Sequence, residues 1–115
     1  MPVRFVLIKL KDGVSVDDYE RFIQAVDYPV VPSLETIRHY RTHRIRPEDK
    51  DPRQLPWDYV ERIDISEREA YEQELAASEG FAEFKRRNPT YVERTYAFWS
   101  EAVEPLEPAA GGPAI

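Results

Sequence analysis

The chain has 115 residues, of which 42% are hydrophobic and 33% are charged, and it contains no cysteine. A chain of this length forms one domain with one core, and the absence of cysteine excludes disulfide scaffolds, thiolate metal sites and thiol chemistry. The 16 basic and 22 acidic side chains give a formal net charge of −6. This charge argues against a nucleic-acid partner, because such a surface needs clustered Lys and Arg.

The most apolar stretch of the chain gives no sign of a membrane segment. Residues 3–10 are interrupted by Arg4 and Lys9 and are far fewer than the roughly 20 residues that span a bilayer. The same stretch lacks the long apolar block of a secretory signal peptide. We therefore expect a soluble, cytoplasmic protein with no membrane partner.

The first predicted elements are a strand and a helix. Residues 3–10 are dense in β-branched and aromatic side chains and stop at Asp12-Gly13, which predicts a strand followed by a turn. Both alternating sets of this strand are largely apolar, so we expect it to be central in a sheet. Ser15 is the predicted N-cap of a helix that Pro29 ends. One apolar stripe of this helix faces the predicted core: Val16, Tyr19, Phe22, Ile23 and Val26.

The next two predicted elements are strands, at residues 37–45 and 57–65. A loop at residues 47–56 separates them and holds three prolines and five charged side chains. Such a loop is too rich in proline to continue either strand.

The last third of the chain predicts a helix and a fourth strand. Ser66, followed three residues later by Glu69, has the spacing of a capping box. It predicts a helix from there through about Ser78. Gly80 interrupts this helix, and a short further turn precedes a strand at residues 91–103.

The predicted order is β-α-β-β-α-β, which is the pattern of ferredoxin-like α+β domains with a four-stranded antiparallel sheet. We assign this domain to residues 1–103 and expect the Pro-, Ala- and Gly-rich segment 104–115 to be a flexible tail. Two helices on one face of the sheet leave apolar side chains of the first and fourth strands on the other face. Monomers seldom expose such a patch, so we expect a homodimer that buries sheet against sheet.

The candidate site residues come from the second and third strands. Alternation along residues 37–45 places both histidines of the protein, His39 and His43, on one face with Arg41. If the isoleucines of the two strands share the core face, Glu61 and Tyr59 lie on that same face. A face of this composition beneath helices would form a small pocket with an apolar lining and a few polar groups.

His43 and His39 are the first candidate catalytic residues, because histidine carries protons near neutral pH and a carboxylate can orient its ring. Glu61 is the third candidate catalytic residue. The candidate substrate-binding residues are Arg41, Tyr59, Tyr96 and Trp57. A structural alternative stays open for each of them, because cross-strand ion pairs and half-buried histidines also stabilise sheets. Tyr96 fits dimer packing as well as the wall of a cavity for a flat ligand.

The other face of the second strand carries Arg38, Tyr40 and Arg44. Acidic side chains of the third strand are expected beside them. Complementary charge of this kind favours a solvated sheet face or a dimer contact over a ligand site.

Neither a metal nor a cofactor is expected. Two histidines four positions apart on a strand lie ~13 Å apart, which is too far to share one metal ion. The sequence has no Gly-rich phosphate loop, no dinucleotide fingerprint and no Gly-x-Ser-x-Gly motif.

Four segments carry a family resemblance: residues 3–11, the helix that ends in Asp27-Tyr28-Pro29, residues 32–44 and residues 57–65. Together they resemble the RedY-like (HapK-like) proteins of prodiginine pigment gene clusters. The resemblance implies a dimeric α+β barrel, in which two ferredoxin-like protomers join their sheets and each keeps a cavity between sheet and helices. It also implies bacterial secondary metabolism, with cofactor-independent cyclases of bisindole pathways among the relatives.

These observations lead to the hypothesis of a cofactor-free cyclase or tautomerase for a flat aromatic pyrrole- or indole-type intermediate. A proton would move through His43 or His39, assisted by Glu61 or Tyr59. Three alternatives stay open. They are a cofactorless monooxygenase, a non-catalytic dimeric binding protein for a small aromatic ligand, and an assembly domain without an enclosed cavity.

Overall fold

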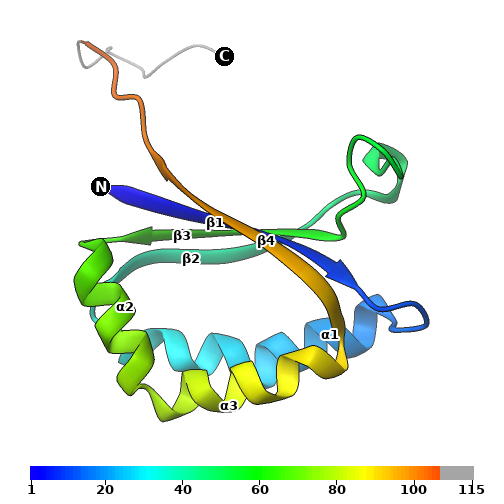
Figure 1. The fold of residues 1–115 in the computed structure, drawn as a ribbon, viewed down its shortest axis with the longest axis horizontal. Helices are drawn as coiled ribbons and strands as arrows, with labels where there is room; N and C mark the ends of the chain where they lie inside the picture. Colours follow the sequence, from blue (N-terminus) through cyan, green and yellow to red (C-terminus); the bar gives the residue numbers. More distant parts are fainter. Residues whose placement is uncertain (107–115) are drawn as a thin grey trace.

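The computed structural model describes residues 1–106 as one antiparallel sheet with helices on one of its faces (Figure 1). The strand order is β2-β3-β1-β4. The strands are β1 (Pro2–Leu10), β2 (Ile37–Arg44), β3 (Tyr59–Ile65) and β4 (Val92–Glu101). The main helices are α1 (Val16–Phe22), α2 (Arg68–Ala77) and α3 (Glu79–Arg87). The predicted α+β fold with a ferredoxin-like order of elements is confirmed.

The predicted tail falls mostly outside the described residues, because its part from 107 to 115 is not among them. Residues 104–106 are exposed and belong to no helix or strand. Within residues 1–106, no helix is both long enough and apolar enough to cross a membrane.

The central position of β1 agrees with its apolar sequence. β1 pairs with β3 on one side and with β4 on the other. Its side chains alternate, so that Val6 and Ile8 face the helices while Phe5 and Leu7 face the opposite way. We call these two sides the helix face and the outer face of the sheet.

The first helix begins as the sequence predicts and ends differently. The Ser15 hydroxyl accepts a hydrogen bond from the Asp18 N–H at 3.0 Å, which confirms the N-cap. Pro29 does not stop the helical backbone. The chain continues as a π-helical segment (Ile23–Asp27) and then a 3₁₀-helix (Tyr28–Ser33), where Pro29 lies in the first turn. Proline is tolerated there because the first N–H groups of a helix have no intrahelical partner.

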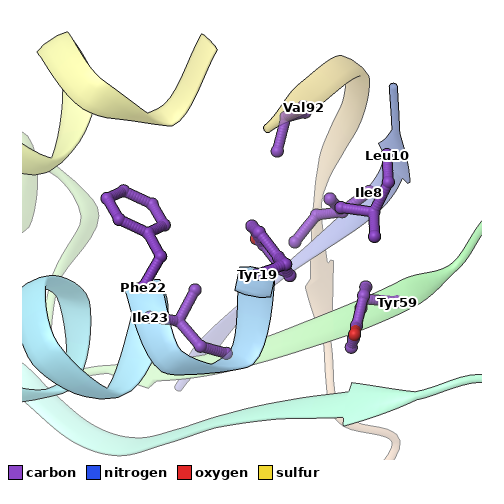
Figure 2. Close-up of a cluster of buried hydrophobic side chains, with 7 residues drawn as sticks. All are labelled: Ile8, Leu10, Tyr19, Phe22, Ile23, Tyr59 and Val92. Carbon is purple, nitrogen blue, oxygen red and sulfur yellow. The ribbon is translucent and has the colours of Figure 1, made fainter. Parts of the chain in front are cut away.

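The helical side chains of this segment form the main core with the sheet (Figure 2). Tyr19, Phe22 and Ile23 are buried as predicted, whereas Val16 is 40% exposed at the start of α1. The cluster of buried side chains is Ile8, Leu10, Tyr19, Phe22, Ile23, Tyr59 and Val92. A second buried cluster lies towards α2 and consists of Ile63, Ile65 and Tyr71.

The capping box predicted at Ser66 and Glu69 is wrong. The N-cap of α2 is Glu67, and it makes no side-chain capping bond. The backbone N–H of Ser66 instead donates to the Thr36 carbonyl at 2.8 Å. Ser66 therefore extends the contact between β3 and the start of β2, and the helix begins after Glu67.

The break between the two later helices lies at Ser78 and not at Gly80. The Ser78 hydroxyl accepts a hydrogen bond from the Phe81 N–H at 3.1 Å and caps α3, which is a nine-residue helix and not a short turn. Gly80 lies in the first turn of α3 against the Val30 side chain. A Cβ atom at Gly80 would be 2.8 Å from Cγ2 of Val30, so this contact needs glycine.

A bulge in β2 changes which side chains face the helices. Ile37 pairs with Ile65, but the next residue paired with β3 is His39, opposite Asp64, so Arg38 is an extra residue. One inserted residue shifts the alternation by one position and exchanges the two faces of the strand beyond it. As a result, Ile37 and Tyr40 both pack against the cluster near α2.

The face assignment predicted for β2 is therefore wrong. Tyr40, Thr42 and Arg44 pair with Ile63, Glu61 and Tyr59 and lie on the helix face. The outer face carries His39, Arg41 and His43. The two histidines do not share a face with Glu61, and Tyr40 and Arg44 do not lie on a solvated sheet face.

The outer face of the sheet has an aromatic patch on β1 and the edge strand β4. The Phe5 and Phe98 rings stack at 5.6 Å between centroids, and Tyr96 lies beside Phe98 at 6.0 Å. Tyr96 is 59% exposed and Phe98 is 39% exposed. This patch agrees with the apolar outer face predicted from the first and fourth strands.

Candidate functional site

A cavity of about 450 Å³ lies between the helix face of the sheet and helices α2 and α3. Its size is typical of small-molecule sites, which occupy roughly 300–1,000 Å³. Most of its lining is aliphatic or aromatic, and two charged groups enter it from the sheet. These are Arg4 of β1 and Glu61 of β3, and the helices add Glu72 of α2 and Lys85 of α3 to the lining. The cavity thus combines an apolar wall with a few polar groups that can orient a ligand.

The Glu61 carboxylate belongs to a buried hydrogen-bonded cluster. The Tyr40 hydroxyl lies 2.7 Å from Oε2 of Glu61 and also hydrogen-bonds to Oδ2 of Asp27. The Thr42 hydroxyl lies 3.3 Å from the same Glu61 oxygen. Tyr40 and Thr42 extend from β2, Glu61 from β3 and Asp27 from the π-helical segment. The phenol of Tyr40 therefore joins two carboxyl groups from different elements.

The number of hydrogens that this cluster can share limits the protonation states of its two carboxyls. A phenol has one hydrogen to donate, so Tyr40 can donate to Asp27 or to Glu61 but not to both. Its contact with the other carboxyl is a hydrogen bond only when that carboxyl keeps its own proton. The cluster is therefore best satisfied with one carboxyl ionised and one protonated, which also avoids two buried like charges.

The pKa values of the two carboxyls agree with this count. Burial, together with the charge of Asp27, raises the pKa of Glu61 from 4.5 to about 7, although hydrogen bonds from Tyr40 and Thr42 oppose the rise. Burial also raises the pKa of Asp27 to about 6 against the effect of its bond with Tyr40. The side chains are only 9% and 6% exposed. Glu61 can therefore both release and accept a proton near neutral pH.

Tyr40 keeps its proton in this setting. Burial and the two neighbouring carboxylates raise the pKa of its phenol well above the usual value of 10.0. The hydroxyl therefore acts as a fixed hydrogen-bond donor that orients the carboxyls, and the carboxyls are the groups that titrate.

Among the predicted catalytic residues, the structure places Glu61 at the cavity and both histidines elsewhere. His39 and His43 are exposed on the outer face, and so is Arg41. Their predicted placement beside Glu61 is wrong, because the bulge at Arg38 turned this part of β2 over.

The three remaining predicted residues also lie away from the cavity wall. The Tyr59 hydroxyl donates to Glu20 of α1 at 2.8 Å, and this carboxylate also binds Arg44. Tyr96 projects from the outer face of β4. Trp57 precedes β3, and the Arg94 guanidinium lies 4.9 Å from the centroid of its ring. Tyr59 thus has a structural role in joining α1 to the sheet.

Asp27 and Tyr40 are the functional candidates that the sequence prediction missed. Asp27 follows Tyr19 and Ile23 at intervals of four, so an acidic residue continues an otherwise apolar helical stripe. An acid in such a stripe is a usable signal, because carboxylates are rarely buried without a partner. Tyr40 could not be found in this way, because strict alternation assigns it to the wrong face.

Comparisons with known proteins identify the family. A family model described as REDY-like protein HapK matches residues 2–103. The crystal structure of HapK from Hahella chejuensis is similar with a TM-score of 0.74 and 24% identity, covering 96% of this chain and 100% of that chain. A dabb family protein with a ferredoxin-like fold from Mesorhizobium loti has a TM-score of 0.68 and 15% identity, covering 90% and 97% of the two chains.

A third solved structure, of an antibiotic biosynthesis monooxygenase, has a TM-score of 0.67 and 12% identity and covers 90% of this chain and 100% of that chain. A search of curated proteins finds no significant match. The structural similarities at these identities show a shared fold, while the family model spans nearly all of the described residues. The chain therefore belongs to the REDY-like HapK family.

Proposed function

We propose that this protein is a cofactor-independent acid–base enzyme of bacterial secondary metabolism. Its substrate would be a flat aromatic intermediate of the pyrrole or indole type, which it cyclises or tautomerises in the cavity beneath α2 and α3. The observation that carries the proposal is Glu61, a buried carboxyl at the cavity wall whose pKa is raised to about 7. Family membership and the fold shared with an antibiotic biosynthesis monooxygenase support secondary metabolism.

Glu61 is the proposed catalytic acid and base. Its carboxylate accepts a proton from one position of the conjugated substrate and returns it at another position. The substrate is isomerised, and no oxidant or reductant is consumed. Positioned proton transfer of this kind contributes on the order of 10²–10⁴-fold in rate. Tyr40 and Asp27 are positioning residues. They do not line the cavity, but they hold the Glu61 carboxyl in place and influence its pKa.

The lining of the cavity suits a flat conjugated ligand. Its aromatic side chains come from α1, α2 and α3, and they are Tyr19, Tyr71, Phe81 and Phe84. Aromatic rings pack well against other flat rings at centroid distances of about 4.5–7 Å. Such a wall excludes water around Glu61 and keeps the substrate close to its carboxyl.

A homodimer is part of the proposal. The patch of Phe5, Tyr96 and Phe98 lies on the outer face, away from the cavity. Two copies that join these faces would bury the aromatic rings and leave one cavity open in each protomer.

Hydrogen exchange at carbon tests the proposed chemistry directly. Oxindole is an indole-type probe whose C3 hydrogens exchange with D2O when a base removes them, and NMR follows the loss of their signal. We expect the wild-type protein to accelerate this exchange over an equal concentration of acetate, and Glu61→Gln to return it to the background rate. Glu69→Gln is the matched control, because Glu69 is exposed on α2 outside the cavity.

The same experiment separates the alternative functions. Wild-type protein that binds oxindole without accelerating exchange would favour a non-catalytic binding protein. Oxygen consumption in the presence of the aromatic ligand, measured with an oxygen electrode, would favour a cofactorless monooxygenase instead, because isomerisation consumes no oxygen.

A further inference from the structure

Arg4 is a cationic residue of the cavity that forms no ion pair within residues 1–106. It lies on the helix face of β1, in one row with Ile63 of β3 and Trp99 of β4. Its side chain is half-buried and lines the same cavity as Glu61. Its guanidinium carbon lies 5.5 Å from the centroid of the Trp99 ring.

Within residues 1–106, no carboxylate lies within ion-pair distance of Arg4. Three other arginines, two of the sheet and one of α2, do have such partners, whereas the exposed Arg38, Arg41 and Arg94 have none within the same residues. These pairs are Arg44 with Glu20, Arg62 with Asp64 and Arg68 with Glu72. A guanidinium offers five N–H donors in a planar fork, and taking it partly out of water without a partner is costly. Arg4 is therefore poised to bind an acceptor inside the cavity.

The charges of Arg4 and Glu61 act on each other. The positive charge of Arg4 lowers the pKa of Glu61, in opposition to the larger effect of burial. The two groups enter the cavity from adjacent strands, which pair antiparallel. A single small ligand can contact both of them.

We propose that Arg4 is the oxyanion-binding residue of this cavity, and that the substrate class is aromatic compounds with a carbonyl oxygen conjugated to the reacting carbon. This inference rests on the proposed function of Glu61 and names the substrate group that it acts beside. The carbonyl oxygen binds the Arg4 guanidinium, and the neighbouring carbon faces the Glu61 carboxylate.

The reaction step follows from this placement. Glu61 removes a proton from the carbon next to the carbonyl. The C–H bond breaks, its electron pair forms a carbon–carbon double bond, and the carbonyl π electrons move to oxygen. The resulting enolate oxygen carries the negative charge beside Arg4, and Glu61 returns the proton to another carbon of the conjugated system. Because the charge on oxygen develops during proton removal, Arg4 stabilises the transition state more than the bound substrate.

Binding of 4-nitrophenol tests the inference without any turnover. Its phenolate is a flat aromatic oxyanion, and its visible absorbance reports the ionised form. We expect the wild-type protein to bind the phenolate in preference to 4-nitroanisole, which has the same ring but cannot ionise. Arg4→Gln should weaken phenolate binding on the order of 10- to 100-fold and leave 4-nitroanisole unaffected, since charge-assisted hydrogen bonds are of this strength.

Arg68→Gln is the matched control. Its guanidinium also lies over the Trp99 ring, at 4.9 Å, but Arg68 does not line the cavity. Its ion-pair partner Glu72 does line the cavity, but both side chains are more than half exposed, so water screens the charge that the substitution leaves on Glu72. We expect it to bind the phenolate as the wild-type protein does. Arg4→Lys keeps the positive charge without the planar fork and should bind the phenolate with intermediate affinity. If circular dichroism shows Arg4→Gln to be unfolded, Arg4→Lys is compared with the wild-type protein instead.

Equal phenolate affinity in the wild-type protein and Arg4→Gln would overturn the inference, and so would a wild-type protein that does not bind the phenolate. This outcome is independent of the catalytic proposal. Glu61→Gln should lose hydrogen exchange but bind 4-nitrophenolate at least as tightly as the wild-type protein, because it lacks the carboxylate that repels the anion.

Discussion

The Tyr40 hydroxyl lies 2.7 Å from the Glu61 carboxylate because one extra residue, at Arg38, turns the remainder of β2 over. Without that bulge the same strand would present His39 and His43 to the helices and expose Tyr40. Because of the bulge, the Tyr40 phenol lies beside the buried Glu61 carboxyl, and the two histidines lie on the outer face of the sheet. The chemistry available to the cavity depends on this local irregularity, as is common for bulges near functional sites.

The first prediction concerns the pH dependence of stability. Glu61 has a raised pKa in the folded state, from 4.5 to about 7, so the folded chain binds its proton more tightly than the unfolded chain. This contribution to stability is complete below about pH 4.5 and is lost as the pH rises towards 7. Between pH 5 and pH 8 it removes on the order of 2–3 kcal/mol from the free energy of unfolding.

Glu61→Gln should therefore lose less stability than the wild-type protein between pH 5 and pH 8, because glutamine does not ionise. Urea unfolding at the two pH values measures the difference, with Glu69→Gln as the control at an exposed site. Identical pH slopes for the wild-type protein and Glu61→Gln would show that Glu61 is not a buried titrating group.

A second prediction concerns Tyr40→Phe. The hydroxyl donates to one carboxyl and accepts from the other, so its loss removes a hydrogen-bond partner from both Asp27 and Glu61, and we expect a loss of about 1–3 kcal/mol in stability. The loss should be larger at pH 8 than at pH 5, because ionised carboxyls need the donor more. The hydrogen bond from Tyr40 also lowers the pKa of Glu61, so the pH midpoint of oxindole exchange should rise in this variant. Tyr96→Phe, at an exposed position of β4, should change neither property.

The third prediction concerns the two histidines. The double variant His39→Gln, His43→Gln should retain the oxindole exchange rate of the wild-type protein within about twofold, because both rings lie on the outer face. A positioned acid or base contributes at least on the order of 10²-fold. A loss of that size, with the oligomeric state unchanged, would contradict the assignment of proton transfer to Glu61.

The fourth prediction concerns assembly. Light scattering coupled to gel filtration should give twice the chain mass for the wild-type protein and the single chain mass for Phe98→Glu, because a carboxylate in the aromatic patch cannot be buried unpaired. Val16→Glu is a matched control, because Val16 is 40% exposed and Phe98 is 39% exposed. Val16 lies at the start of α1 and not on the outer face of the sheet, so this variant should keep the mass of the dimer. A monomeric wild-type protein would remove the proposed dimer.

The fifth prediction concerns the contact between Gly80 and Val30. Alanine normally stabilises a helix relative to glycine by about 1 kcal/mol. Gly80→Ala should instead destabilise the protein by about 1–3 kcal/mol, because its Cβ would lie 2.8 Å from Val30. Val30→Ala combined with Gly80→Ala should recover part of the loss in a thermal melt. Higher stability of Gly80→Ala alone would mean that Val30 moves aside freely.

Local pattern was enough to predict much of this fold. The apolar alternation of β1 indicated a central strand, and β1 does pair on both sides. Ser15 was identifiable as an N-cap from its place before two acidic residues and an apolar stripe. Glu61 was also found, because its strand keeps a regular alternation from Tyr59 to Ile65. In each case the side chains that determine the element are neighbours along the chain.

The remainder of the site depended on contacts between distant segments. Ile37 and Tyr40 both pack against buried side chains of β3 and α2, and this shared burial accommodates the bulge between them. The π-helical segment likewise brings Asp27 to Tyr40, from which it is separated by 13 positions. The amino-acid sequence by itself determined the order of the elements and most of their apolar faces, since these follow from period and capping. Only the tertiary structure decided which polar side chains meet. One extra residue in a strand costs little free energy locally, and packing across the whole domain determines which face of the strand is buried.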